Sequence, residues 1–145
     1  MGRRDLAAVA EIEQASYPYP WSRGIFEDCM RIGYSCRVAE IDGAIAGYAV
    51  LSAAAGEAHL LNLCVAPRSR GTGLGRDMLE AVLVEARLRH AARMFLEVRP
   101  SNEIARELYR QYGFRIIGRR PDYYPAADGR EDALIMVRQL DVDDG

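Results

Sequence analysis

The sequence contains no lysine, so all 19 of its basic side chains are arginines. The 21 acidic residues slightly outnumber them, and the formal net charge is only -2. A near-neutral protein lacks the surplus of positive charge on which affinity for nucleic acid depends. We therefore expect no direct contact with nucleic acid, and we attribute the all-arginine composition to genomic base composition rather than to 19 anion-binding sites.

Cysteine, histidine and long apolar runs are scarce as well. Cys29, Cys36 and Cys64 are odd in number and lack Cys-x-x-Cys spacing, which argues against a disulfide framework and against a zinc site. We expect His59 to pack in a strand and His90 to lie on a helix surface, so no metal is predicted. The chain has no run of 18 apolar residues and no signal-peptide pattern at its start. These absences predict a cytoplasmic protein that does not contact membranes.

What is present fits a single globular domain. The chain has 145 residues, of which 50% are hydrophobic and 28% charged, and this is enough to bury one core. We predict one domain over residues 1–140, followed by an acidic, frayed tail at 141–145, and we expect a monomer.

The first half of the chain predicts two helices and then three strands. Asp5 and Ser22 are placed to cap helices that end before Tyr17 and near Ile32. The pattern then favours strands at 34–41 and 44–53, joined by an Asp-Gly turn, and an apolar central strand at 58–65.

The second half predicts a helix after a glycine-rich loop and a buried strand at 94–98. Ser101 or Asn102 can cap a further helix, which Gly113 ends. Two last strands are expected at 114–118 and 133–140, joined by a loop that contains Tyr123 and Tyr124. The fold class is therefore α/β, or α+β in stricter usage.

The glycine-rich loop between strand and helix is a candidate anion site. Its sequence is Arg70-Gly71-Thr72-Gly73-Leu74-Gly75-Arg76. Glycines allow backbone N–H groups to converge, and a helix N-terminus adds partial positive charge. The loop lacks the Lys-Ser/Thr end of a Walker A motif and the third glycine of a dinucleotide fingerprint. Taken alone, it could also be a mobile turn.

The wider pattern resembles the GNAT acetyltransferase superfamily. Arg70-x-x-Gly73-x-Gly75 after an apolar strand is similar to that superfamily's pyrophosphate motif, and residues 96–102, 105, 108–109 and 113–114 match its second half in order and spacing. The resemblance implies acetyl-CoA as co-substrate. It also implies a mixed, mostly antiparallel sheet of six to seven strands, flanked by four helices and with a V-shaped opening for acetyl-CoA.

Two end motifs narrow the resemblance. Tyr19-Pro20-Trp21-Ser22 and the segments 123–125 and 128–133 are similar to the bacterial ribosomal-protein-alanine N-acetyltransferases. This implies that the acceptor is the α-amino group at the N-terminus of a protein, in this group an alanine of a small-subunit ribosomal protein. Transfer would be direct, within a ternary complex. Tyr19, Trp21 and Tyr124 would line the groove for the peptide, or they are simply loop anchors.

The resemblance also assigns the donor site. Backbone amides of Arg70 to Arg76 would hold the pyrophosphate, while Leu63, Cys64, Val65 and Asn102 would line the pantetheine and acetyl arm. Cys64 could in principle form an acyl-enzyme, but no histidine partner is recognisable, and a small core residue is favoured.

Two residues are candidates for the proton transfers. By resemblance Glu97 is the general base, acting through water, although a carboxylate in a buried strand could instead pair with Arg99 or another arginine. Tyr109 is the candidate acid for the leaving thiolate. Its place on an apolar helix face would otherwise indicate core packing.

Three alternatives remain open. The acceptor could be a lysine side chain or a small-molecule amine, or the chain could be a non-catalytic acyl-CoA-binding module or a ribosome assembly factor. The sequence leaves the roles of Arg119, Arg120 and Arg130 undetermined. Related chains carry a strand before the first helix, where this one has only Met1 to Arg4. That strand is missing, the start is truncated, or a sheet edge is left open.

Overall fold

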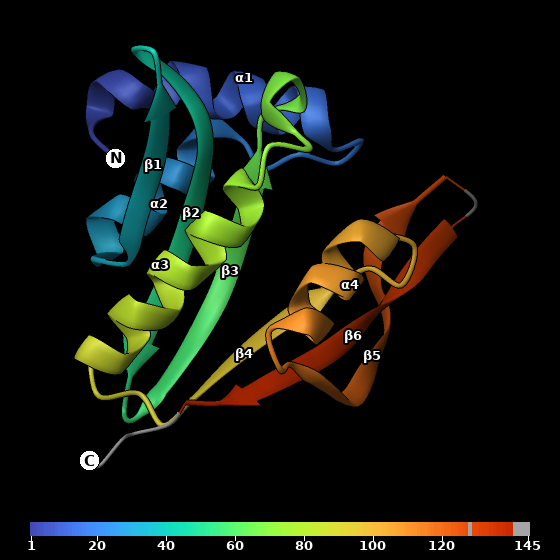
Figure 1. Ribbon diagram of the computed structural model, residues 1–145. Coiled ribbons are helices and arrows are strands. Elements are labelled where there is room, and N and C mark those ends of the chain that lie inside the picture. The colour runs from blue at the N-terminus through green and yellow to red at the C-terminus, as the bar shows by residue number, and fades with distance from the viewer. Residues whose placement is uncertain (128, 141–145) are drawn as a thin grey trace. The chain divides into compact units, whose positions relative to one another are not determined.

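The computed structural model describes residues 1–127 and 129–140 (Figure 1). These residues form four α-helices and six strands. The helices are α1 (Leu6–Ser16), α2 (Arg23–Ile32), α3 (Leu74–Leu88) and α4 (Glu103–Gln111). The strands are β1 (Ser35–Ile41), β2 (Ala44–Ala54), β3 (Glu57–Val65), β4 (Arg93–Val98), β5 (Arg115–Ala126) and β6 (Gly129–Gln139), in the order β1-β2-β3-β4-β6-β5. The predicted fold class is confirmed. The tail expected at 141–145 lies outside the described residues.

The chain divides into two compact units. The first contains Met1–Ser52 and Leu60–Glu85, and the second contains Ala53–His59 and the described residues from Ala86 onward. Within the described residues no strand precedes α1, and β1 is the edge strand of the sheet. None of the helices described is long and apolar enough to cross a membrane.

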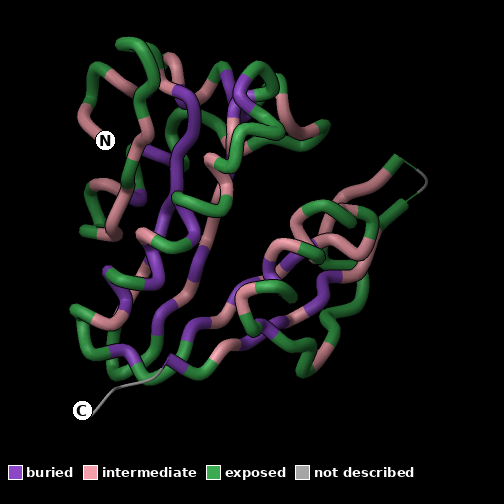
Figure 2. Tube along the Cα trace, in the orientation of Figure 1, coloured by how far each residue is buried: buried purple, intermediate pink, exposed green. Residues whose placement is uncertain are grey.

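Strand β2 is the centre of the first unit, and the buried stretch of the trace follows it in Figure 2. Tyr48 and Val50 of β2 pack in a cluster with apolar residues of α1 and α2, among them Leu6, Val9, Ile12, Phe26 and Cys29. A Cβ at Gly47 would lie 2.8 Å from both Cys64 O and Met78 Sδ, so α3 approaches β2 closely. Burial on both faces explains why β2 is a continuous apolar run of small residues.

Two of the three predicted helix caps are confirmed. Ser22 Oγ accepts from Ile25 N at 3.3 Å, and Asn102 Oδ1 accepts from Ala105 N at 3.2 Å. Asp5 is at the N-cap position of α1 as predicted, but its carboxylate makes no cap hydrogen bond to that helix and accepts from Gly2 N at 2.7 Å instead. A short 3-10 turn, Arg3–Asp5, leads into α1 and leaves Asp5 with helical dihedral angles rather than the extended ones of a cap.

The second unit contains an antiparallel hairpin that is longer than predicted. β5 and β6 pair from Arg115↔Val137 to Ala126↔Gly129, so residues 119–126 and 129–132 belong to strands rather than to the loop that we expected. Pro121 and Asp122 look like loop residues, but they fall in a register shift between Arg120 and Tyr124. An edge strand such as β5 can carry proline and a bulge and continue beyond them.

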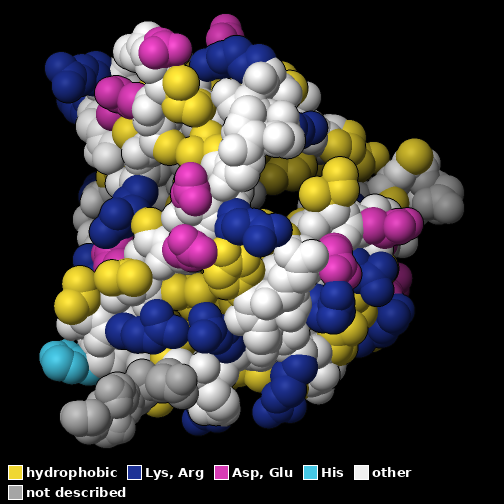
Figure 3. All heavy atoms as spheres, viewed as in Figure 1, with side chains coloured by type: hydrophobic (Ala, Val, Ile, Leu, Met, Phe, Trp, Pro, Cys, Tyr) yellow, Lys and Arg dark blue, Asp and Glu magenta, His cyan; other side chains and the backbone are white. Residues whose placement is uncertain are grey.

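Charges of both signs are mixed on the surface. On the face that Figure 3 shows, basic and acidic side chains are interspersed rather than gathered into patches of one sign. This arrangement agrees with the formal net charge of -2.

Candidate active site

The glycine-rich loop leads from a 3-10 turn, Pro67–Ser69, into α3. Gly71 and Gly73 have φ angles of 79° and 87°, which side-chain-bearing residues rarely adopt, and a Cβ at either would meet nothing within 4 Å. Thr72 Oγ1 donates to Ser69 O at 2.6 Å and Arg70 N to Pro67 O at 3.3 Å, so both are used to shape the turn. The first-turn amides of α3, which begins at Leu74, lack intrahelical partners by geometry.

The end of β3 supplies the other residues predicted for the donor arm. Leu63 O accepts from Tyr17 Oη at 3.5 Å, and Val65 O accepts from Arg70 Nε at 3.3 Å. Cys64 is 3% exposed and belongs to the core cluster of the first unit, as expected for a small core residue. These residues and the glycine loop lie in the same unit.

The loop between α1 and α2 is held by a buried carboxylate, Glu13. Its Oε2 accepts from Trp21 N at 3.0 Å, and its Oε1 accepts from Tyr48 Oη at 2.5 Å and from Asn62 Nδ2 at 3.1 Å. The Trp21 ring packs on Phe26, with 5.2 Å between ring centroids. Trp21 is thus an anchor of the core, whereas Tyr19 is 45% exposed.

Glu97 lies on the face of β4 opposite its three buried neighbours Met94, Leu96 and Val98. Its Oε1 is 2.8 Å from His59 Nε2, and its Oε2 is 3.5 Å from Arg120 Nη2. The hydrogen bond with His59 lowers the pKa of Glu97 below its ordinary value, with the charges of His59 and Arg120 acting in the same direction against burial. The carboxylate is therefore ionised at neutral pH. The ion pair considered above exists, but with Arg120 rather than Arg99.

Tyr109 and Tyr124 belong to the same neighbourhood as Glu97 in the second unit. Burial raises the pKa of Tyr124, and the negative charges of Glu97, Tyr123 and Tyr109 add to this effect while Arg99 opposes it. Tyr109 on α4 is 7% exposed. Its ring meets that of Phe114 edge-on at 5.6 Å. Both predicted catalytic residues and Tyr124, a predicted substrate residue, thus lie in the same unit, and Tyr124 is close enough to Glu97 to respond to its charge.

Arg99 and Glu131 tie the start of α4 to the β5–β6 hairpin. Arg99 Nη1 donates to Pro125 O at 2.8 Å and to Glu131 Oε1 at 3.2 Å. Glu131 also accepts from Ser101 N at 2.9 Å and from Ser101 Oγ at 3.1 Å. Asn102 follows directly, and its Oδ1 serves the helix cap. Asp128, part of the second end motif, lies outside the described residues.

The structure gives intrachain partners for three arginines whose roles the sequence left undetermined. Arg119 pairs with Asp132 at 2.9 Å, Arg120 contacts Glu97, and Arg130 donates to the backbone oxygens of Asp122 and Tyr123. Sequence reasoning also missed His59 as the partner of Glu97. No signal in the sequence gives the register of one strand against another, so this contact could not be predicted.

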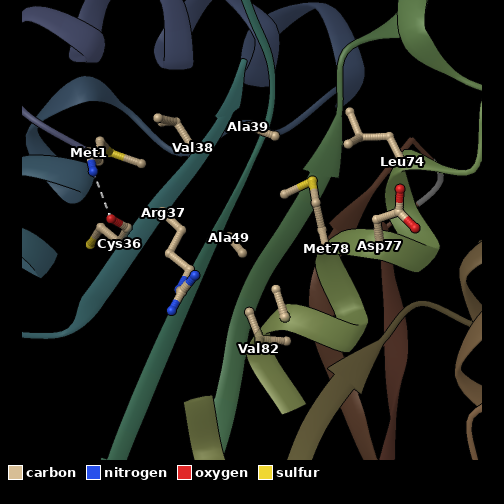
Figure 4. Close-up of a pocket in the computed structure, with 11 residues that line it drawn as sticks. Met1, Cys36, Arg37, Val38, Ala39, Ala49, Leu74, Asp77, Met78 and Val82 are labelled. Carbon is tan, nitrogen blue, oxygen red and sulfur yellow. Dashed lines mark hydrogen bonds between the residues drawn. The ribbon is translucent and has the colours of Figure 1, made fainter. Parts of the chain in front are cut away.

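A separate pocket of about 420 Å³ lies in the first unit between β1, β2 and α3. Figure 4 shows Val38, Ala49 and Met78 around it, with the charged side chains of Arg37 and Asp77 nearby. None of the predicted site residues except Leu74 lines this pocket.

Comparison with known proteins identifies close relatives. The family model "Acetyltransferase (GNAT) family" matches residues 6–114. The [Ribosomal protein bS18]-alanine N-acetyltransferase of Escherichia coli K12 is 39% identical over 133 residues, which cover 92% of this chain and 90% of the relative. The crystal structure of the E. coli ribosomal-protein-S18-alanine N-acetyltransferase superposes with a TM-score of 0.90 at 37% identity and covers 97% of this chain and 90% of that one. Ard1 from Thermoplasma volcanium gives 0.89 at 30% identity and covers 97% and 94%.

Proposed function

The chain belongs to the GNAT acetyltransferase family, and from this we propose that it transfers acetyl from acetyl-CoA to the α-amino group of an N-terminal alanine of a ribosomal protein. The likeness in sequence and structure to the bS18-alanine N-acetyltransferases spans nearly the whole chain and supports this acceptor. One observation carries the chemistry. Glu97 is an ionised, largely buried carboxylate that is hydrogen-bonded to His59 and whose charge acts on Tyr124.

The donor site fits the diphosphate of acetyl-CoA. The open space at Gly71 and Gly73 leaves room for an anion against the backbone, and the N-terminal amides of α3 supply donors and partial positive charge. We assign these amides, with Leu63, Cys64, Val65 and Asn102, to the holding of acetyl-CoA. A thioester supplies the activated acetyl group.

Glu97 acts as the general base. A free α-amine has a pKa of about 7.7 to 8.0, so part of it is already neutral at pH 7 and the base has a modest task. Glu97 takes the amine proton through a water molecule, while the amine nitrogen forms the new N–C bond and the C–S bond breaks. Tyr109 gives its phenolic proton to the departing sulfur.

Two aromatic side chains are proposed contacts of the acceptor peptide. Tyr124, half-buried beside Arg99, and Tyr19, exposed in the α1–α2 loop, are the aromatic side chains that we assign to the peptide. Trp21 serves this site by anchoring the loop, because its ring packs on Phe26. We propose a cytoplasmic, monomeric enzyme that needs no metal and does not contact nucleic acid.

The rival acceptors are a lysine side chain and a small-molecule amine. A lysine amine has a pKa of about 10.4. Removing a proton from it therefore requires a stronger base than removing one from an α-amine. The lowered pKa of Glu97 therefore favours the α-amine.

The test is CoA release in the presence of acetyl-CoA and three matched peptides. One begins with a free alanine, the second has the same sequence with a blocked N-terminus, and the third is blocked but contains an internal lysine. We expect turnover on the first alone. Turnover on the third would support the lysine alternative, and the absence of turnover on all three peptides would point to a small-molecule amine as acceptor or to a binding module.

A further inference from the structure

The side chains of His59 and Glu97 form a close pair within the second unit. His59 Nε2 lies 2.8 Å from Glu97 Oε1, and the side chains are 35% and 13% exposed, respectively. His59 is therefore the member of the pair that solvent reaches, while the carboxylate is largely covered. Such a pair can be a cross-strand contact and nothing more, or it can take part in proton transfer.

The chemistry of the hydrogen bond fixes the tautomer of His59. An ionised carboxylate can only accept hydrogen bonds, so a neutral His59 must present Nε2–H to Glu97. Nδ1 then carries a lone pair. This is the arrangement in which a carboxylate orients an imidazole and stabilises its protonated form.

We propose that His59 and Glu97 act as one proton-accepting pair, in which Nδ1 of His59 holds the proton released by the acceptor amine. This inference rests on the proposed acetyl transfer and changes where the proton comes to rest. An amine N–H bond breaks and the Nδ1–H bond of His59 forms, with water as the carrier. Glu97 stays ionised opposite the new imidazolium. The pair returns its proton to solvent, and Tyr109 regains from solvent the proton that it gave to sulfur.

The surrounding charges favour this division of roles. Arg120 on β5 lies 3.5 Å from Oε2 of Glu97 and opposes protonation of the carboxylate. Tyr124 on β5 responds to the charge of Glu97, and Glu57 and Arg93 pair with each other at 3.5 Å on β3 and β4. His59 is the more exposed member of the pair, so water can carry a proton to its Nδ1 more readily than to the covered carboxylate.

The first test compares the dependence of kcat/KM on pH for wild type, His59→Gln and Glu97→Gln, with the free-alanine peptide. Glutamine can keep the N–H donor toward Glu97 but cannot hold a proton. We expect His59→Gln to lose about 100-fold at pH 7 and to approach wild type near pH 9.5, where the amine is already neutral. His90→Asn removes the chain's other histidine and is the matched control, expected to follow wild type throughout.

The two variants distinguish a failure of the proposed role of His59 from a failure of the proposed acetyl transfer by Glu97. A wild-type profile for His59→Gln, or a loss equal at every pH, would overturn the role of His59. Full activity of Glu97→Gln would instead remove Glu97 from the mechanism and with it the proposed base.

A second test needs no turnover. In His90→Asn, His59 is the sole imidazole, so its ring ¹⁵N shifts can be read directly by NMR. We expect the Nε2–H tautomer in the neutral state, and loss of that preference in Glu97→Gln. A predominant Nδ1–H tautomer in the neutral state would contradict the proposal.

Discussion

The guanidinium of Arg99 lies over the ring of Tyr124, with 4.4 Å between its Cζ and the ring centroid. The same guanidinium donates to Pro125 O, the next residue of β5. Arg99 therefore fixes both the side chain and the backbone at the point of the hairpin to which we assign the peptide. Its planar group is suited to stacking and to a fixed fork of hydrogen bonds, which a lysine cannot reproduce.

Arg99→Lys should consequently weaken peptide binding more than it slows chemistry. A partly buried cation–π contact contributes roughly 1 kcal/mol, so we expect the KM for the peptide to rise about fivefold or more with little change in kcat. Steady-state rates at saturating acetyl-CoA and varied peptide measure this. The control is Arg119→Lys, which alters an exposed ion pair of the same hairpin and should change neither constant. An unchanged KM in Arg99→Lys would argue against Tyr124 as a peptide contact.

Tyr109→Phe tests the assignment of Tyr109 as the general acid that protonates the departing sulfur. The substitution keeps the ring that packs on Phe114 and removes only the hydroxyl. General acid catalysis contributes typically about 10²- to 10⁴-fold, so we expect kcat to fall by about 100-fold with peptide KM unchanged. Tyr112→Phe, at the C-cap of the same helix, is the matched control. Undiminished turnover of Tyr109→Phe at saturating peptide would remove the assignment.

Features that depend on neighbouring residues in the chain could be predicted from the sequence, whereas contacts between strands could not. Ser22 and Asn102 could be predicted as caps because a cap depends on residues three positions apart in the chain. The contacts of Glu97 with His59 and Arg120 could not, because they join strands whose register is set by tertiary packing. The segment with Tyr123 and Tyr124 was expected to be a loop because propensity is local, while the ladder between β5 and β6 includes Tyr124.

Gly73→Ala tests the donor site. The φ angle of Gly73 is 87°, so alanine would be strained although its Cβ has open space around it. If this loop holds the diphosphate, the KM for acetyl-CoA should rise by about tenfold, because a cost of 1 to 2 kcal/mol falls on the binding conformation. Gly43→Ala is a matched control, since Gly43 has a φ of 80°, equally open space and a place in the β1–β2 turn. Equal effects of both variants on this KM would show that the loop is not specific to the donor.

The lowered pKa of Glu97 predicts how stability depends on pH. Because the folded pKa lies below the ordinary value of 4.5, ionised Glu97 stabilises the fold above that value, and this contribution disappears as the pH falls through the folded pKa. Urea unfolding should find Glu97→Gln less stable than wild type at pH 7. The difference should shrink below pH 4.5. A difference that stays constant down to pH 3 would mean that the substitution acts through packing rather than charge.

Glu13 is 2% exposed. Its carboxylate accepts hydrogen bonds from three neutral donors, Tyr48 Oη, Asn62 Nδ2 and Trp21 N. A buried charge is tolerated only when hydrogen bonds replace its hydration, and those to charged groups contribute about 1.5 to 3 kcal/mol. Glutamine would have to turn an NH₂ group toward one of these donors. We therefore expect Glu13→Gln to lower the free energy of unfolding by about 2 kcal/mol.

A double-mutant cycle of Glu13→Gln with Tyr48→Phe should give a coupling energy of at least about 1 kcal/mol, since the two share a hydrogen bond. Asp28→Asn, in an exposed pair with Arg31, is the control and should change stability by less than about 0.5 kcal/mol. Because Glu13 also holds Trp21 N, the variant separates two roles for the α1–α2 loop. If the loop forms part of the peptide groove, the KM for the peptide rises together with the loss of stability. If its aromatic residues are only anchors, stability falls while that KM stays at the wild-type value.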